Sequence, residues 1–378
     1  MKTNTPLMVK YLQNKASRSH IPLSGTFELT PCCNMDCRMC YVRKTRQEVD
    51  ALGGEISPKQ WIEMGKVCRD NGMLFLLLTG GEPFLYHGFR EVYSELKKLG
   101  LFLSINSNGT MISQETVDWL KQDPPTRINM TLYGGSNETY ERLCRNPKGF
   151  DQAVAAAKRL LDAGIPLHFN ASMTPYNIDD LDEIFRIGEE LGVRVRASSY
   201  MFPPMRRDES MVGCGDRFNA EDAGQFAAKI DLLRLLPEHF RERAQAMRNN
   251  ELLHAEEESE LDEAFREPLR CHAGKSAFWI NWKGEMSPCG MMTQPISHPF
   301  RDGFLPAWHQ IVEATNQLYM PPKCVSCKKR DVCSVCGASA FTETGTYGQV
   351  PHYICDMTDS MIRHTEELLC TMEQGSDS

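Results

Sequence analysis

The segment from residue 25 to residue 41 reads GTFELTPCCNMDCRMCY, a short apolar run followed at once by cysteines in a CxxxCxxC pattern. These cysteines are Cys33, Cys37 and Cys40. In an α/β barrel, the loops that follow the strands carry the working residues. The segment therefore predicts a metal-binding loop at the carboxyl end of a first strand.

Further runs rich in apolar residues recur along the chain, with helix-like stretches between them. Six runs are interpreted as strands, at residues 25–30, 73–79, 101–106, 127–132, 167–172 and 193–198. The helix-like stretches cover residues 57–70, 89–99, 150–163 and 178–191, and Gly100, Gly164 and Gly192 suit helix ends. This alternation predicts an α/β fold with a parallel sheet, curved by right-handed crossovers into a barrel or a partial barrel.

Changes in composition divide the chain into four parts. Residues 1–24 form an N-terminal segment, and residues 25–215 hold the alternating strands and helices. Residues 216–268 are charged and helical in pattern, which predicts a helical connector with Glu256 to Glu258 on a solvated face. Residues 269–378 are dense in cysteine, so we expect metal ligation, little regular structure and a final helix there.

Charge and cysteine usage restrict the class of protein. The chain has 42 Lys and Arg against 50 Asp and Glu, a formal charge of -8, and no concentrated basic tract for nucleic acid or an anionic membrane. The longest apolar run near the N-terminus, residues 73–78, is far shorter than the roughly 20 residues that cross a bilayer. We expect a cytoplasmic protein in which ten of the 15 cysteines, those in two groups, bind metal instead of forming disulfides.

The first cysteine group favours an iron–sulfur cluster. Three thiolates can hold three irons of a [4Fe–4S] cluster and leave the fourth open to a small molecule, whereas an electron carrier normally uses four. The alternative is a structural zinc site, which would need a fourth Cys or His, and none lies between Cys40 and Cys68. Cys32, next to Cys33, is interpreted as a bystander.

With this triad, the run Thr79-Gly-Gly-Glu-Pro83 resembles the radical S-adenosylmethionine (SAM) superfamily, whose GGEP motif receives the amino group of SAM. The resemblance implies a partial (β/α)6 barrel with the catalytic cluster on Cys33, Cys37 and Cys40. The residues that resemble SAM contacts are Gly80, Gly81, Glu82, Asn108, Thr131, Asn170 and Ser172. For the last four, the alternative is an ordinary role in caps and turns.

Seven cysteines near the C-terminus resemble the SPASM extension of one branch of that superfamily, which binds auxiliary [4Fe–4S] clusters. The resemblance implies two ligand sets, giving three clusters per chain with the catalytic one. The first set is Cys271, Cys289 and Cys336, and the second is Cys324, Cys327, Cys333 and Cys355. A pair of zinc knuckles is the alternative.

The resemblance implies an enzyme that cleaves SAM reductively and removes hydrogen from a substrate, with an electron donor such as flavodoxin or ferredoxin. We expect oxidative modification, by crosslinking or dehydrogenation, of a ribosomally made peptide or a protein side chain. A peptide would be recognised directly, through a short leader, or by a separate leader-binding protein. The alternatives are a dehydrogenase of a small molecule such as a sugar or antibiotic precursor, and a non-catalytic iron–sulfur or zinc protein.

Residues near predicted strand ends have two readings. Tyr133, Arg196, Tyr200 and Phe202 line the substrate pocket or belong to the core and its rim. The run YMFPPMRR, residues 200–207, predicts an extended loop after the sixth strand. Its two arginines, at 206 and 207, are expected to meet an acidic peptide or solvent.

Overall fold

The computed structural model describes residues 7–252 and 266–376. Six parallel strands form its centre, and all six were predicted from the sequence. They are β1 (Ser24–Glu28), β2 (Phe75–Thr79), β3 (Phe102–Ser107), β4 (Arg127–Thr131), β5 (Leu167–Ser172) and β6 (Val195–Ser198). The predicted ends of β5 agree residue for residue, because its alternation of apolar and polar residues spans the whole strand.

Helices alternate with these strands as predicted. The expected helices are α3 (Pro58–Asp70), α4 (Phe89–Lys98), α7 (Gly149–Asp162) and α8 (Leu181–Glu190), the last preceded by the 3-10 turn η2 (Ile178–Asp180). Four helices were not predicted: α1 (Leu7–Arg18), α2 (Arg46–Ala51), α5 (Gln114–Gln122) and α6 (Asn137–Cys144). The last two are short, and their clearest signal is an N-cap serine, at Ser113 and Ser136.

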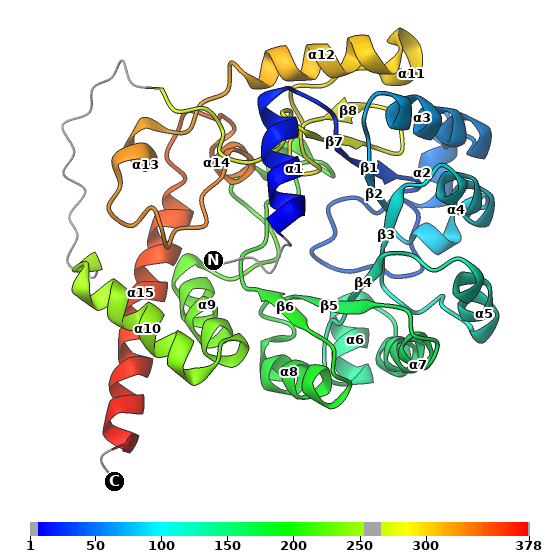
Figure 1. Cartoon of the computed structure of the whole chain (residues 1–378). Coiled ribbons are helices and arrows are strands. Elements are labelled where there is room, and N and C mark those ends of the chain that lie inside the picture. The colour runs from blue at the N-terminus through cyan, green and yellow to red at the C-terminus, as the bar shows by residue number, and fades with distance from the viewer. Residues whose placement is uncertain (1–6, 253–265, 377–378) are drawn as a thin grey trace.

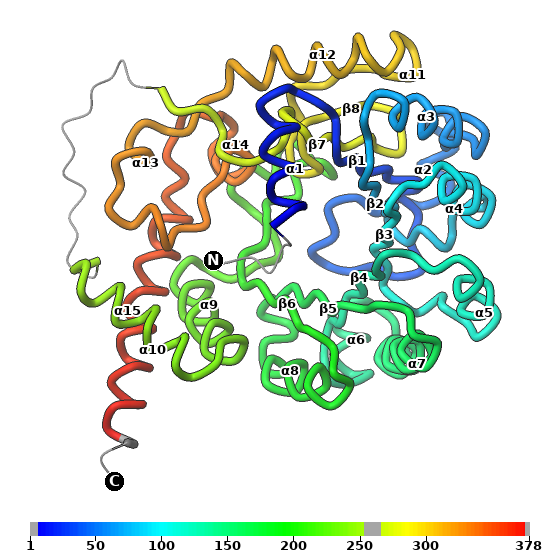
Figure 2. The backbone as a smooth tube through the Cα atoms, in the orientation of Figure 1, coloured from blue at the N-terminus to red at the C-terminus, as the bar shows by residue number. Residues whose placement is uncertain are grey.

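The sheet has two chemically different faces. Alternate side chains such as Phe27, Leu78, Ile105, Ile128 and Phe169 are fully buried and pack in one core with the helices. Figure 2 shows the strands as an arc with α3, α4, α5, α7 and α8 outside it. The other alternate side chains face the concave side and are mostly polar and half-buried. The core therefore lies outside the arc, and the concave face is left for ligands.

Two further strands extend this sheet beyond β1. Strand β7 (Ala277–Ile280) pairs with β1 in parallel, and β8 (Met286–Ser287) pairs with β7 in antiparallel, giving the order β6-β5-β4-β3-β2-β1-β7-β8. Among the described residues β6 and β8 are the ends of the sheet, so the barrel is partial, as expected. The sequence did not reveal β7, since four residues are too few to show a period.

The C-terminal region is helical, so the expectation of little regular structure there was wrong (Figure 1). It contains α11 (Pro299–Asp302), α12 (Phe304–Thr315), α13 (Pro322–Ser326), α14 (Gly337–Thr344) and the predicted final helix, α15 (His352–Ser376). Several of these helices are too short for a helical period to stand out between the glycines and prolines. The limits of the four parts of the chain remain predictions.

Helices α9 (Ala220–Arg234) and α10 (Pro237–Asn249) agree with the expected connector, whereas Glu256 to Glu258 lie outside the described residues. Helix α15 packs along α9. A Cβ atom on Gly224 would lie 2.3 Å from the carbonyl oxygen of Met357, so glycine permits this close contact. Within residues 7–252 and 266–376, no helix is long and apolar enough to cross a membrane.

The loop after β6 leads into the 3-10 turn η3 (Glu209–Met211), and another such turn, η1 (Pro83–Leu85), follows β2. Tyr200, on the first of these loops, donates a hydrogen bond to Glu343 of α14 over 2.8 Å. Glu343 is 3% exposed and also pairs with Arg217. Phe202 packs edge-on against Tyr200. These contacts join the barrel to the C-terminal region.

Candidate active site

The predicted triad lies on the loop that leaves β1. Cys37 is buried, and Cys33 and Cys40 are half-buried. Burial raises the pKa of the Cys33 thiol to about 12, and the nearby charges of Glu82, Cys37 and Cys40 raise it further, against a hydrogen bond from Met35. Burial also raises the pKa of Cys40. The three thiols are therefore close neighbours in a site from which water is largely removed.

Donor groups surround these sulfur atoms. The backbone N–H of Met35 lies 3.4 Å from Cys33 Sγ, and that of Arg43 lies 3.3 Å from Cys40 Sγ. The amide Nδ2 of Asn108 lies 3.6 Å from Cys33 Sγ. Hydrogen bonds to sulfur stabilise thiolates and adjust the potential of a bound cluster. The donor set thus fits an iron–sulfur cluster.

No three Cys, His, Asp or Glu side chains within the described ranges are placed to share a single metal ion. A [4Fe–4S] cluster makes a different demand, because each cysteine binds a separate iron. The three thiols of one loop are compatible with that demand.

The glycines after β2 are explained by close contact with the triad loop. The N–H of Gly81 donates to Thr30 O over 2.7 Å, and that of Glu82 donates to Cys32 O over 2.9 Å. A Cβ on Gly80 would lie 2.4 Å from Thr30 O, and one on Gly81 would lie 2.4 Å from Cys32 O. Only glycine allows the two backbones to approach in this way. Cys32 enters this contact through its carbonyl group.

The carboxylate of Glu82 is fully buried between the ends of β2 and β3. It accepts hydrogen bonds from Asn108 N at 2.8 Å, Ser107 Oγ at 3.0 Å and Phe84 N at 3.2 Å. Burial raises its pKa to about 7, against these hydrogen bonds. Glu82 therefore holds two strand ends together, a role that sequence reasoning missed.

Asn108 joins the end of β3 to the triad loop. Its Nδ2 donates to Asn34 Oδ1 over 2.9 Å, and its Oδ1 accepts from Thr110 N over 2.9 Å. The second contact is the turn-forming role that the residue type favours. Through the first, Asn108 also fixes the loop that carries Cys33.

Thr131, Asn170 and Ser172 lie on the concave face near the carboxyl ends of β4 and β5. Thr131 and Asn170 are partners in the strand register, and Ser172 follows two residues later on the same face. All three are half-buried. The structure thus brings these candidate SAM contacts to the same edge of the sheet as the triad.

Two residues hydrogen-bond to Cys37 in a way that the sequence did not predict. Cys144, at the end of α6, is fully buried and hydrogen-bonds to the Cys37 thiol, which lowers the pKa of Cys37. Tyr133, an expected pocket or core residue, is half-buried and makes a second hydrogen bond to Cys37. No spacing signal reveals Cys144, because α6 is reached only after three further strands.

Cys271, Cys289 and Cys336 come from three segments that lie near one another. Burial raises the pKa of Cys289, and the charges of Cys336 and Cys271 contribute to the rise. Cys336 occupies the N-cap of α14, where Ser339 N lies 3.4 Å from its sulfur. A helix N-terminus favours a thiolate, so this position suits a metal ligand.

The other C-terminal cysteines lie around α13 and the start of α15. Burial raises the pKa of Cys333, and the charge of Cys327 contributes. Thr358 of α15 lies 3.4 Å from Cys333 Sγ through its hydroxyl, one turn after Cys355. Cys324 belongs to α13. The start of α15 is therefore next to the loop that carries Cys333.

Arg206 lies between the two cysteine regions, which corrects the expectation that it meets a peptide or solvent. It donates to the buried carboxylate of Glu28 over 2.7 Å and to Gly290 O over 3.1 Å. Trp279 Nε1 donates to the same carboxylate over 3.1 Å. The guanidinium also lies 5.3 Å from the centre of the Tyr41 ring. Arg206 thus contacts residues next to both Cys40 and Cys289, whereas Arg207 is exposed.

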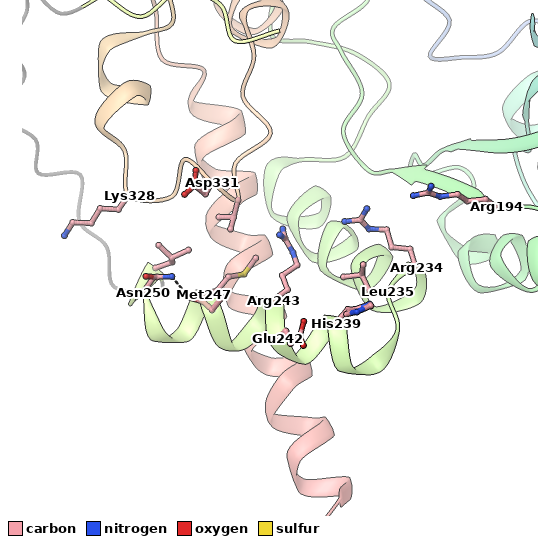
Figure 3. Close-up of a pocket in the computed structure, with 13 residues that line it drawn as sticks. Arg194, Arg234, Leu235, His239, Glu242, Arg243, Met247, Asn250, Lys328 and Asp331 are labelled. Atoms are coloured by element: carbon pink, nitrogen blue, oxygen red, sulfur yellow. Dashed lines mark hydrogen bonds between the residues drawn. The ribbon is translucent and has the colours of Figure 1, made fainter. Parts of the chain in front are cut away.

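A separate pocket of about 790 Å³ lies beside α10 (Figure 3). Arg194, just before β6, lines one side of it, and Lys328 and Asp331 of the C-terminal cysteine loop line the other. His239 and Arg243 of α10 lie between them. Sequence reasoning singled out none of these residues, since they meet only in the folded chain.

The family described as the radical SAM superfamily matches residues 27–187. An AdoMet-dependent heme synthase of Methanosarcina barkeri is 24% identical over 342 residues, covering 87% of this chain and 95% of its own. The sporulation killing factor maturation protein SkfB of Bacillus subtilis is 25% identical over 286 residues, covering 75% of this chain and 64% of its own. Both alignments extend beyond the family match.

Among solved structures, SuiB of Streptococcus suis bound to S-adenosylmethionine superposes with a TM-score of 0.62 and 17% sequence identity. The superposition covers 94% of this chain and 82% of SuiB. At this identity the likeness establishes the fold, and it includes both the partial barrel and the helical C-terminal region.

Proposed function

Because this chain belongs to the radical SAM superfamily and carries a SPASM-like C-terminal region, we propose that it oxidatively modifies a ribosomally made peptide or a protein side chain. The product would be a crosslinked or dehydrogenated residue. SkfB, named for the maturation of a sporulation killing factor, is similar over three quarters of this chain, and a PqqA peptide cyclase of Rhizobium meliloti is similar over 47% of it. The proposal carries that activity class over to this chain.

We assign the catalytic [4Fe–4S] cluster to Cys33, Cys37 and Cys40, which the donors from Met35 and Arg43 support. When bound and reduced, such a cluster supplies the electron that cleaves SAM to methionine and a 5′-deoxyadenosyl radical. Gly80, Gly81 and Glu82 would position the amino group of SAM. Asn108, Thr131, Asn170 and Ser172 would contact the rest of the molecule along the same edge.

We assign two auxiliary clusters to the C-terminal cysteines, giving three per chain. Cys271, Cys289 and Cys336 form the set nearer the barrel, which the link through Arg206 to Gly290 supports. The distal set is Cys324, Cys327, Cys333 and Cys355. These clusters would accept the electron that an oxidised substrate releases, and a flavodoxin or ferredoxin would reduce the catalytic site.

The polarity of the concave face is the observation that carries the choice of a peptide. Its half-buried positions on β3, β4 and β5 hold Ser104, Asn106, Asn129, Thr131, Asn170 and Ser172, together with the basic residues Arg127 and His168. Amides and hydroxyls match the alternating donors and acceptors of a peptide backbone. A large flat ring system binds better in a pocket lined by apolar and aromatic side chains.

A second candidate follows from the heme synthase relative. The alignment with the heme synthase covers 95% of that protein, whereas the alignment with SkfB covers 64% of SkfB. Similarity of length therefore favours the heme synthase as the guide, and with it a tetrapyrrole substrate. We rank it second because the phenylalanine side chains at the described concave positions of β1 to β6, Phe75 and Phe102, stand at the amino ends of β2 and β3, away from the cysteine triad.

Substrate-dependent cleavage of SAM separates the two candidates. Anaerobically reconstituted enzyme with SAM and dithionite would be offered peptides encoded by short reading frames beside the gene, and in parallel a tetrapyrrole. We expect a peptide to stimulate 5′-deoxyadenosine formation and to lose hydrogen, as judged by mass spectrometry. A Cys33→Ala enzyme supplies the background. Stimulation by the tetrapyrrole alone would replace the peptide proposal with the second candidate.

A further inference from the structure

Basic side chains gather on the concave face of β4, β5 and β6. His168 lies opposite Asn129 of β4. Continuing the register of β5 and β6 by one residue places His168 opposite Arg194, just before β6. The next row towards the carboxyl ends is Thr131, Asn170 and Arg196. Arg127 starts β4 on the same face, one row below Asn129. Three arginines and a histidine therefore share one surface.

Contacts orient these groups towards each other. Arg127 Nε donates to Asn129 Oδ1 over 2.8 Å, which directs the guanidinium up the face. Asn129 Nδ2 in turn donates to Asn106 Oδ1 over 2.8 Å and fixes the amide. Burial, followed by the charges of Arg127, Arg196 and Arg194, lowers the pKa of His168 to about 4. All three arginines thus act on the same imidazole.

This positive charge has no counterion among the described residues. Arg127, Arg194 and Arg196 form no ion pair there, although many surface arginines do. Of the concave positions on β1 to β6, only Glu28 is a carboxylate, and Arg206 pairs with it. His168 Nδ1 is buried and has no hydrogen-bond partner in the described structure. A cluster of cations held in place without an anion is suited to bind one from outside.

Arg194 also connects this face to the pocket beside α10. It lines one side of that pocket, and Lys328 lines the far side (Figure 3). Arg234 and Arg243, which lie between, are paired with Asp231, so among the described residues Arg194 and Lys328 are the arginine and lysine of the pocket that form no ion pair. An extended ligand with several carboxylates would reach both places, whereas a small dicarboxylate would fill only the first.

We propose that Arg127, Arg194 and Arg196, grouped around His168, form a carboxylate-binding site that receives an acidic peptide substrate, with the pocket beside α10 holding a further part of the same peptide. The inference rests on the proposed peptide function and defines its substrate class: a chain with Glu or Asp near the modified residue. The site lies beside and below Thr131 and Asn170, the proposed SAM contacts.

The test uses reconstituted protein with SAM bound and two probes. The first is a blocked Gly-Glu-Gly tripeptide, followed by the NMR signal of His168, which is identified by its absence in His168→Gln. The second is a longer fluorescent glutamate-rich peptide, followed by anisotropy. We expect Arg127→Gln to weaken both about tenfold, as loss of a charge-assisted hydrogen bond does, and Arg127→Lys to restore most of the binding. Lys328→Gln should weaken only the longer peptide.

Matched controls separate this site from general charge effects. Arg301→Gln removes an exposed arginine that pairs only with its neighbour Asp302, so it should alter neither probe. Glutamine versions of both peptides should not bind. The affinity for SAM should be the same in Arg127→Gln as in the unchanged protein.

Other results would overturn all or part of the inference. Equal binding of the glutamine peptides, or binding unaffected by Arg127→Gln, would remove the carboxylate site and leave the peptide function standing. A loss of SAM affinity in Arg127→Gln would reassign the cluster to the cofactor. An unaltered response of the longer peptide in Lys328→Gln would exclude the pocket. Protoporphyrin could also compete with the peptides for binding while its dimethyl ester does not. If, in addition, no peptide supports turnover, the anion site would stand and the peptide function would be overturned.

Discussion

The loop after β1 and the region after β7 both gather cysteines, but the chain holds them in place by different means. The first loop is tied to the ends of β2 and β3 by backbone hydrogen bonds and stands on the large barrel core. In the second, β7 and α12 pack on that same barrel core, whereas the segments that carry Cys289 and Cys336 pack around a small cluster of buried residues, Leu269, Met292, Met320 and Ala338. Folding alone therefore arranges the barrel thiols, whereas cluster binding should contribute to the fold of the C-terminal region.

The largest effect that this comparison predicts is on chemistry. Replacing Cys33, Cys37 and Cys40 with Ala should abolish formation of 5′-deoxyadenosine from SAM and dithionite, because the catalytic cluster loses all three ligands. The thermal midpoint should fall only slightly, since strand-end hydrogen bonds hold the loop. Iron-dependent absorbance from the auxiliary clusters should remain.

The control for this variant is Cys214→Ala, which removes an exposed cysteine outside both groups. Its turnover should be unchanged. If the triad variant unfolds, or if the unchanged protein binds stoichiometric zinc with no iron, the barrel loop is a structural metal site and the comparison fails.

The next effect concerns stability. Replacing Cys324, Cys327 and Cys333 with Ala should lower the stability of α13, α14 and the loop between them by several kcal/mol, because ligation substitutes for a large core there. SAM cleavage should persist while substrate modification is lost. Calorimetry and product analysis on the same preparation measure both. A variant with an unaltered thermal midpoint would show that the small apolar cluster suffices.

A smaller effect is expected where two backbones meet. Gly81→Ala places a methyl group 2.4 Å from Cys32 O, which must move the triad loop. Overpacking of this kind costs about 1–3 kcal/mol. We also expect weaker SAM binding, measured by calorimetric titration. Gly348→Ala, where no atom lies within 4 Å of the added carbon, should change neither quantity.

The smallest effect depends on pH and arises from the barrel itself. The pKa of His168 is lowered from 6.5 to about 4 in the folded protein, so the unfolded chain binds its proton more readily. The stability that this histidine contributes is complete above pH 6.5 and is lost as the pH falls from 6.5 to 4. With solvent screening the loss should be about 1 kcal/mol or less. Denaturant titrations of His168→Gln at several pH values should lack this loss of stability between pH 6.5 and pH 4.

Sequence reasoning succeeded where a property repeats or where a motif is continuous. The six strands were predicted because apolar runs alternate with helix-like stretches along the chain. The cysteine triad and the GGEP run could be recognised because each lies on a single loop. It failed where distant segments meet. The pairing of β7 with β1, the contact of Cys144 with Cys37 and the ion pair of Arg206 with Glu28 join residues that are more than 100 positions apart. Such contacts depend on the packed structure, and no local pattern records them.

The position of β7 has a consequence for how the protein is made. Strand β1 leaves the ribosome before β2, which can pair with one of its edges soon afterwards. The opposite edge is covered by Ala277–Ile280, which is synthesised some 250 residues later. Until then the nascent barrel presents an open strand edge, the kind of surface through which chains associate wrongly. Slow translation between β6 and β7 should therefore increase the demand for chaperones more than slow translation after β8.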